Sequence, residues 1–263
     1  MTAPALILLA QGSEESRVAQ QLHTLRKQMQ MMRSAQSIHL AFTDHCPPSG
    51  PQVVSTLVAR GVREIVFVPL DLTRAIEPDI ATSAMVAQLS STHPDVAFGV
   101  SRPLGPATEL LNIVDERLRE ALRVRSTTEL DGLVLSTPGN GDVRGHALVS
   151  RRARQWSTHH KLPCVVSVAD SSGPNAAQAI SALRAQGRRH IAVGSFFLVS
   201  DEAWQIQAEL AAASGAEAVS APFGCDERIM EIALGRYAYA AMDLLDGARI
   251  ASDTREFDIA ASH

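Results

Sequence analysis

The chain has 263 residues, of which 46% are hydrophobic, so it can bury one large core or two of ordinary size. Its 24 Lys and Arg residues are balanced by 28 Asp and Glu residues, which gives a formal net charge of -4. This balance lacks the basic excess with which proteins bind a phosphate backbone, and it therefore argues against nucleic acid as a partner.

Three cysteines are spread along the chain without a CxxC pair, so neither a disulfide framework nor a thiolate zinc site is expected. They are Cys46, Cys164 and Cys225. The first apolar stretch has no positive residue ahead of it and is too short for a signal peptide. No apolar run approaches the roughly 18 to 20 residues of a membrane-spanning helix. We therefore expect a cytoplasmic protein that does not bind a membrane.

Short apolar runs alternate along the chain with longer segments that are compatible with helices, the pattern of repeated βα units. In the first half, the runs expected as strands are residues 5–10, 38–42, 64–70 and 96–100. In the second half they are residues 132–135, 163–168, 190–198 and 216–221. Runs rich in Val, Ile and Leu that alternate with helices predict parallel sheets with helices on both faces.

The two halves also resemble each other in sequence. The segment STLVARGVREIVFVPLDL begins at Ser55, and SALRAQGRRHIAVGSFFL begins at Ser181, 126 positions later. The same offset aligns Gly61 with Gly187, which are expected to end helices in the left-handed conformation. A duplicated unit is therefore predicted.

We predict an α/β fold of two similar doubly wound lobes, each a four-stranded parallel sheet flanked by helices. The lobes are expected at residues 1–124 and 130–246, followed by a disordered tail at 247–263. Two complete repeats could close a cleft within one chain, which is compatible with a monomer or a homodimer.

Ligands of open α/β sheets bind beyond the carboxyl ends of the strands. The first strand ends there in Gln11, Gly12 and Ser13. Gly12 permits close backbone approach, Ser13 can cap the next helix, and Gln11 is expected to point at the ligand. The alternative is a plain strand-to-helix turn.

The second strand ends in Asp44, His45 and Cys46, a mixture of hard and soft metal ligands. On an extended strand Asp44 and Cys46 share one side and His45 points away, unless the loop has already begun. Alternatively, His45 and Cys46 are ordinary packing residues before two prolines.

After the third strand, Asp71 could act as a base if a closed cleft and a neighbouring carboxylate raised its pKa. The alternative is a surface ion pair between Asp71 and Arg74. Glu77 belongs to the same segment, and His146 could enter the cleft or face solvent at a helix start.

The segments LILLAQGSEESRVAQQL, AFTDHCPPSG, VREIVFVPLDL and HPDVAFGVSRPLGP together resemble the class II tetrapyrrole chelatases, the sirohydrochlorin cobalt and iron chelatases of the CbiX and SirB type. The chain is similar to the long form with two repeats. The resemblance implies a metal chelatase, a lyase that inserts Co²⁺ or Fe²⁺ into sirohydrochlorin in cobalamin or siroheme biosynthesis. The metal is then a substrate, and no permanently bound cofactor is implied.

The resemblance is weaker in the catalytic residues. The family usually carries a histidine after the first strand, an acidic residue after the second, and a second histidine after the third. Here the first position is Gln11, the second is Asp44, and the third falls in residues 73–78, which contain no histidine. In the second half Pro138 stands at the histidine position, and only Asp170 echoes the pattern.

Chelation needs weak metal ligands and a base for two pyrrole protons, and imidazole suits both tasks whereas a glutamine amide takes no proton. The resemblance therefore implies Asp44 and His45 as catalytic metal ligands with Cys46 beside them and with Gln11 as a hydrogen-bonding partner. The residues expected to hold the carboxylate-rich substrate are Gly12, Ser13, Asp71, Arg74 and Arg102, with Arg144 as a further candidate.

Two other functions stay open from sequence. One is a non-catalytic carrier or regulator of the same fold that binds a tetrapyrrole or a metal. The other is an unrelated two-lobed binding protein or a flavodoxin-like module, since doubly wound halves host many functions.

Overall fold

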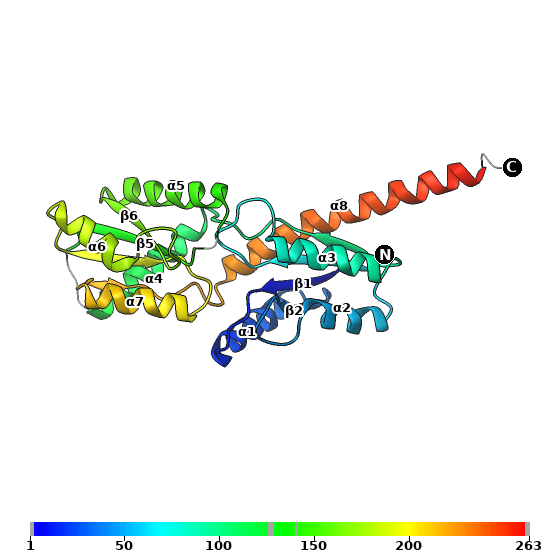
Figure 1. Ribbon diagram of the computed structural model, residues 1–263, viewed down its shortest axis with the longest axis horizontal. Coiled ribbons are helices and arrows are strands. Elements are labelled where there is room, and N and C mark those ends of the chain that lie inside the picture. Colours follow the sequence, from blue (N-terminus) through cyan, green and yellow to red (C-terminus); the bar gives the residue numbers. More distant parts are fainter. Residues whose placement is uncertain (1–2, 126–128, 140, 261–263) are drawn as a thin grey trace.

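The computed structural model describes residues 3–125, 129–139 and 141–260, with the backbone alone for 247–260 (Figure 1). Its first sheet has the order β2-β1-β3-β4, and all of its strand pairs are parallel. The strands are β1 (Ala5–Ala10), β2 (Ile38–Phe42), β3 (Glu64–Pro69) and β4 (Ala97–Val100). They lie where the apolar runs predicted them, with ends that differ by one residue at most.

The second sheet repeats this arrangement in the order β6-β5-β7-β8, again with parallel pairs only. Its strands are β5 (Gly132–Thr137), β6 (Cys164–Val168), β7 (Ile191–Ser195) and β8 (Ala218–Val219). The same strand order in both sheets confirms two similar doubly wound units. β7 and β8 are shorter than the apolar runs that predicted them.

Helices connect the strands and cover both faces of each sheet (Figure 1). They are α1 (Ser16–Met32), α2 (Gly50–Ala59), α3 (Ile80–Thr92), α4 (Leu110–Arg125), α5 (Val143–His160), α6 (Ala176–Ala185), α7 (Glu202–Ala213) and α8 (Glu227–Ala260). Before α6, Asn175 and Gln178 each accept a hydrogen bond of 2.9 Å from the other's backbone N–H, a capping box. Gly61 and Gly187 end α2 and α6 with φ values of 86° and 85°, as predicted.

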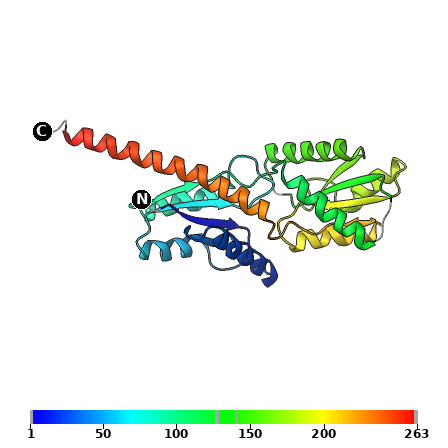
Figure 2. The ribbon, with the colours of Figure 1, turned by 180° about the vertical axis from the view of Figure 1, so that it is seen from behind.

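The last helix of each repeat packs on the sheet of the other repeat. α4 contacts β7 and β8 of the second sheet, whereas α8 contacts β3 and β4 of the first. Figure 2 shows α8 lying along the first sheet while the green helix α4 lies in the other lobe. A Cβ atom on Gly194 of β7 would lie 2.5 Å from Val114 Cγ1, so the absence of a side chain there lets α4 approach.

The lobe boundaries of 1–124 and 130–246 stay a prediction; across them, α4 packs on the second sheet and α8 packs on the first. Within the tail predicted as disordered, 247–263, the backbone of α8 continues to Ala260. Residues 261–263 of that tail lie outside the described residues. Among the helices that the structure describes, none is both long enough and apolar enough to cross a membrane.

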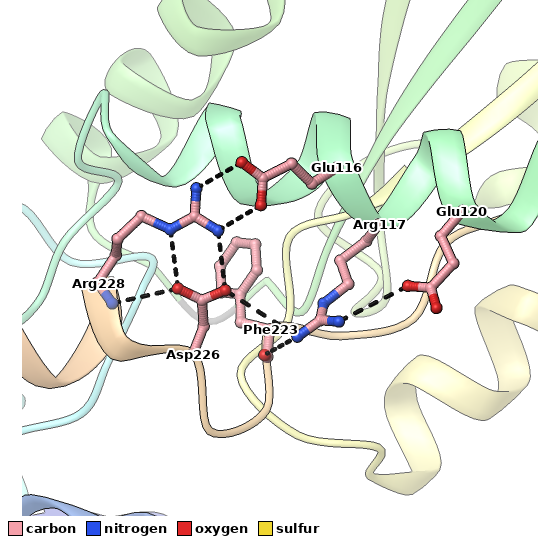
Figure 3. Close-up of polar contacts among 6 residues, drawn as sticks. All are labelled: Glu116, Arg117, Glu120, Phe223, Asp226 and Arg228. Atoms are coloured by element: carbon pink, nitrogen blue, oxygen red, sulfur yellow. Dashed lines mark hydrogen bonds and ion pairs between the residues drawn. The ribbon is translucent and has the colours of Figure 1, made fainter.

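A charged cluster joins α4 to the turn that precedes α8 (Figure 3). Arg228 bonds Asp226 at 2.8 Å through Nε and Glu116 of α4 at 2.6 and 2.9 Å through its terminal nitrogens. Arg117 of α4 donates to the Phe223 carbonyl at 3.4 Å. The two exchanged helices are thus connected directly to each other.

One hydrophobic core runs through both lobes. Leu6 and Leu8 on one face of β1 belong to the same buried cluster as Leu133 and Leu135 on β5. The opposite faces of the two sheets form separate clusters beneath α2 and α3 and beneath α6. The shared core and the exchanged helices together hold the two lobes against each other.

Candidate functional site

The loops at the carboxyl ends of the two sheets face each other and touch. The Ala75 N–H, in the loop after β3, donates a hydrogen bond of 3.4 Å to Asp142 Oδ2 at the start of α5. In the second lobe, the Ser200 N–H in the corresponding loop after β7 donates a hydrogen bond of 3.1 Å to Gln21 Oε1 of α1. The two loop-bearing edges therefore meet at the region where a ligand of this fold is expected.

The loop after β1 is fixed by Gly12. Its N–H donates a hydrogen bond of 2.8 Å to Asp44 Oδ1, and a Cβ atom on Gly12 would lie 2.0 Å from the Asp44 carbonyl oxygen. The expected close backbone approach is thus present, and Gln11 beside it is exposed. Ser13 does not cap α1, because the helix begins at Ser16 and Ser13 Oγ accepts from the Glu15 N–H at 3.1 Å instead.

The loop after β2 turns sharply at His45. The strand ends at Phe42, His45 has a φ of 55°, and the Cys46 N–H donates a bond of 2.6 Å to the Asp44 carbonyl. The sequence left open whether His45 lies on the extended strand or in the loop. In the structure it lies in the loop. His45 Nε2 consequently lies 3.6 Å from Asp44 Oδ2, and the two side chains are 49% and 39% exposed.

Asp44, His45 and Cys46 do not form a three-ligand group. Within the part of the chain that the structure describes, only Asp115, His159 and His160 bring three such ligand atoms within 4.8 Å of one another. Cys46 Sγ lies beside Gly12, 3.0 Å from the position of a Cβ atom there. The geometry thus brings together the Asp44 and His45 pair and leaves the role of Cys46 a prediction.

Asp71 shapes the loop after β3. Its Oδ1 accepts hydrogen bonds from the Thr73 N–H at 2.6 Å, from Thr73 Oγ1 at 2.8 Å and from the Arg74 N–H at 3.1 Å. Arg74 Nε lies 3.6 Å from Asp71 Oδ2, and both side chains are partly exposed. The structure thus has the ion pair between Asp71 and Arg74 that the sequence offered as the alternative to a base. In the same turn, the Thr73 carbonyl lies against Gly141 and Gly145 of the second lobe.

Arg102, Arg144 and Glu77 are exposed near the same edge. His146, which the sequence placed either in the cleft or in solvent, is exposed near the start of α5, beside the lobe contact. A Cβ atom on Gly141 would lie 2.5 Å from the Thr73 carbonyl oxygen and 2.9 Å from His146 Cδ2. An imidazole of the second lobe therefore approaches the loop in which the first lobe lacks a histidine.

Asp201 is a residue of this edge that the sequence analysis missed. It caps α7 by accepting a bond of 2.8 Å from the Trp204 N–H. Burial is the main cause that raises the pKa of its carboxyl, and the charge of Glu15 from the first lobe raises it further. The capping pattern before α7 was the available signal, but only the fold brings Glu15 close.

The second lobe repeats the arrangement of the first around Asp170. A Cβ atom on Gly139 would lie 2.3 Å from Asp170 Cγ, so this carboxyl group packs against the loop after β5 much as Asp44 packs against Gly12. Asp170 Oδ1 also accepts from the Ser172 N–H at 2.9 Å. The predicted equivalence of Asp44 and Asp170 is thus visible in the loops that surround them.

Two surface hollows in the described residues lie away from this edge. One of about 520 Å³ follows α5 near Arg154 and His159, and one of about 710 Å³ lies between the end of α1 and α8 near Arg33 and Tyr237. Neither is lined by Gln11, Asp44 or Thr73. The candidate site therefore coincides with neither of these two hollows.

Comparisons with known proteins identify similar sequences and folds. A family model described as CbiX matches residues 5–121. The sirohydrochlorin cobaltochelatase of Priestia megaterium is 30% identical over 84 residues, which are 32% of this chain and 28% of that protein. The aligned part thus spans little more than a quarter of that curated relative.

Two solved structures share the fold over nearly the whole chain. SirB from Bacillus subtilis with Fe³⁺ has a TM-score of 0.74 at 17% identity and covers 91% of this chain and 96% of its own. The sirohydrochlorin chelatase SirB from Bacillus subtilis subspecies spizizenii in complex with cobalt has a TM-score of 0.72 at 16% identity, covering 92% and 96%. At such identities the likeness shows the two-lobed fold alone.

Proposed function

We propose that this chain is a class II chelatase of the CbiX and SirB type, which inserts Co²⁺ or Fe²⁺ into sirohydrochlorin on the route to cobalamin or siroheme; the match of residues 5–121 to the CbiX family model and the fold shared with SirB support this. The observation that carries the proposal is the Asp44 carboxylate, exposed beside His45 at the carboxyl edge of the first sheet. It occupies the position where the family has an acidic residue. The metal ion is a substrate in this reaction.

Asp44 and His45 divide the chemistry between them. Asp44 Oδ1 is held by the Gly12 N–H, which leaves Oδ2, on the side of His45, to bind an incoming metal ion. A carboxylate and an imidazole are weak enough as a pair to release Fe²⁺ or Co²⁺ to a macrocycle. Once the metal ion has left it, the imidazole can accept a pyrrole proton.

His146 supports the proposal from the other lobe. Its ring approaches Thr73 in the loop that lacks the family's second histidine, as the contacts around Gly141 indicate. We propose it as the group that removes a proton on that side. Gln11 and Arg102 are both exposed at the edge of the first sheet and are proposed to bind the carboxylates of the macrocycle.

The contact between the lobes limits how a macrocycle binds. Because the loops touch at Ala75 and Asp142, a planar ligand must bind beside that contact, over Gln11 and His45, or between lobes that have moved apart. Both edges come from one chain, so a monomer is sufficient for the reaction. The three free cysteines support a reducing location such as the cytoplasm.

The test is an anaerobic assay in which sirohydrochlorin and Co²⁺ or Fe²⁺ are mixed with the protein and the macrocycle absorbance is followed. We expect acceleration over the protein-free rate and a loss of about 10²-fold or more in Asp44→Ala, in line with the contribution of a positioned acid or base. The matched control is Asp95→Ala, which removes an exposed carboxylate before β4 and should leave the rate unchanged. Macrocycle binding without acceleration would contradict the proposal and favour a carrier.

A further inference from the structure

A second group of metal-ligating side chains lies away from the facing loops, between α4 and α5. Asp115 of α4 and His159 and His160 at the end of α5 each offer one ligand atom, and these atoms all lie within 4.8 Å of one another. Among the residues that the structure describes, this is the only such group. The proposed chelatase reaction does not use it.

The carboxylate of this group is held in position by its neighbours. Asp115 Oδ1 accepts a hydrogen bond of 2.8 Å from Trp156 Nε1, and Oδ2 accepts one of 2.6 Å from Arg119. The Asp115 side chain is 13% exposed, and Trp156 is buried. Partners that orient a ligating carboxylate are typical of metal sites and contribute to their affinity.

The two imidazoles are adjacent and accessible. His160 Nε2 lies 2.6 Å from Asp115 Oδ1, and the rings of His159 and His160 are 4.8 Å apart between centroids at 88°. His159 is exposed, so its ring can rotate toward the carboxylate. Both residues belong to the last turn of α5, where the helix dipole favours a positive charge.

We propose that Asp115, His159 and His160 bind a divalent transition-metal ion such as Zn²⁺, Co²⁺ or Ni²⁺. Two imidazoles with one carboxylate suit these ions better than Mg²⁺ or Ca²⁺, which prefer oxygen ligands. The ion takes the place of the proton between His160 Nε2 and Asp115 Oδ1, and that proton is released to solvent. Arg119 remains on the other oxygen, and water completes the coordination.

The location gives the ion a structural consequence. α4 belongs to the first repeat but packs on the second sheet, and α5 belongs to the second repeat. A metal bound between Asp115 and the two histidines therefore fastens the exchanged helix to the lobe that it covers. Because the ion binds the folded chain, it should also raise the melting temperature.

The experiment is a titration of the full chain with Co²⁺, followed by calorimetry and by the visible absorption of the bound ion. We expect a saturable site that Asp44→Ala retains and that His159→Ala weakens at least about tenfold, since losing even an outer partner of a metal site costs about 10- to 100-fold. The structure describes no hydrogen bond of the His159 side chain, so this variant should fold. His160→Ala is the second variant.

Two controls separate this site from the proposed chelatase site. His93→Ala removes a histidine from the end of another helix, α3, and should leave Co²⁺ binding unchanged. Asp44→Ala should retain the site while it loses chelation. Quenching of Trp156 fluorescence by Ni²⁺ gives an independent readout, because its indole nitrogen bonds the ligating carboxylate; Trp204→Phe removes the other tryptophan signal.

The inference is overturned if wild-type protein shows no saturable binding. It is equally overturned if His159→Ala and His160→Ala both bind Co²⁺ as the wild type does. Binding that disappears only in Asp44→Ala would assign the ion to the facing loops, which supports the proposed function and rejects this second site.

Discussion

The Gly12 N–H donates a hydrogen bond of 2.8 Å to Asp44 Oδ1, and this bond joins the loop after β1 to the loop after β2. The two loops are so close that a Cβ atom on Gly12 would lie 2.0 Å from the Asp44 carbonyl oxygen. The orientation of the proposed metal-binding carboxylate therefore depends on the absence of a side chain one position after Gln11.

Gly12→Ala should consequently displace the Asp44 loop. We expect chelation to fall at least about tenfold and the free energy of unfolding to fall by about 1–3 kcal/mol, the usual cost of an overpacked contact. Anaerobic rates and urea unfolding measure the two effects. The control is Gly235→Ala in α8, where nothing lies within 4 Å of the new methyl group and helix propensity predicts a gain of about 0.5–1 kcal/mol. Unchanged chelation in Gly12→Ala would contradict the role given to this contact.

Gly194→Ala tests the packing of the exchanged helix α4. Its new methyl group would lie 2.5 Å from both Val114 Cγ1 and Trp156 Cη2, so we expect a loss of about 1–3 kcal/mol in unfolding free energy. Gly99→Ala is the matched control beneath the other exchanged helix, because its nearest neighbour is 3.4 Å away and little change is expected. Chemical denaturation of both variants measures the difference, and equal stability would argue against close packing of α4 on β7.

Asp226→Asn tests the charged cluster between α4 and the turn before α8. The hydrogen bond from Arg228 is the main cause that lowers the pKa of Asp226, whose side chain is 13% exposed. Loss of this charge should lower the unfolding free energy by about 1.5–3 kcal/mol. Glu116→Gln is the control: its carboxylate is 57% exposed, so we expect at most about 1 kcal/mol.

The same ion pair predicts a dependence of stability on pH. Because the pKa of Asp226 is lower in the folded chain than its ordinary value of 3.8, its contribution is present above that value and is lost as the pH falls through the folded pKa. Unfolding midpoints measured from neutral pH down to the acid limit should therefore converge between wild type and Asp226→Asn. A difference that persists in acid would exclude the ion pair as its source.

Ser136 and Ser167 lie opposite each other on β5 and β6, and the buried Oγ atom of each has no hydrogen-bond partner among the described residues. Replacing both with alanine removes two unsatisfied hydroxyls, so we expect the unfolding free energy to stay equal or to rise by about 1 kcal/mol. Ser195→Ala is the contrast, since Ser195 Oγ donates to the Ser220 carbonyl at 2.6 Å and accepts from Trp204 Nε1 at 2.9 Å. Thermal unfolding compares the stability of the double variant with that of Ser195→Ala. A marked loss of stability in the double variant would contradict the prediction.

Part of the loop geometry at the candidate site could be predicted from the sequence, whereas the roles of its residues stay predictions. A glycine two positions after the end of a buried strand indicated the close approach at Gly12, and the offset of the repeats paired Asp44 with Asp170. The orientation of His45 could not be predicted, because it depends on whether the strand ends before it, and the structure ends β2 at Phe42. The approach of His146 to Thr73 and of Asp201 to Glu15 joins residues of different lobes, which no local pattern reports.

The grouping of Asp115 with His159 and His160 could not be predicted from the sequence either. Asp115 lies far from the two histidines along the chain, and the helix that carries it belongs to the first repeat. The three residues meet only because α4 packs on the second sheet beside α5.

By itself the sequence determined the strands, the helices, the parallel sheets and the duplication, because periodicity, Gly punctuation and apolar runs act over a few neighbouring residues. Only the tertiary structure decided which sheet each final helix covers. An apolar helix face is stabilised by any apolar sheet within reach, so α4 and α8 could exchange places without a change in their patterns. This arrangement gives one shared core and brings the carboxylate of Asp115 on α4 beside His159 and His160 of α5.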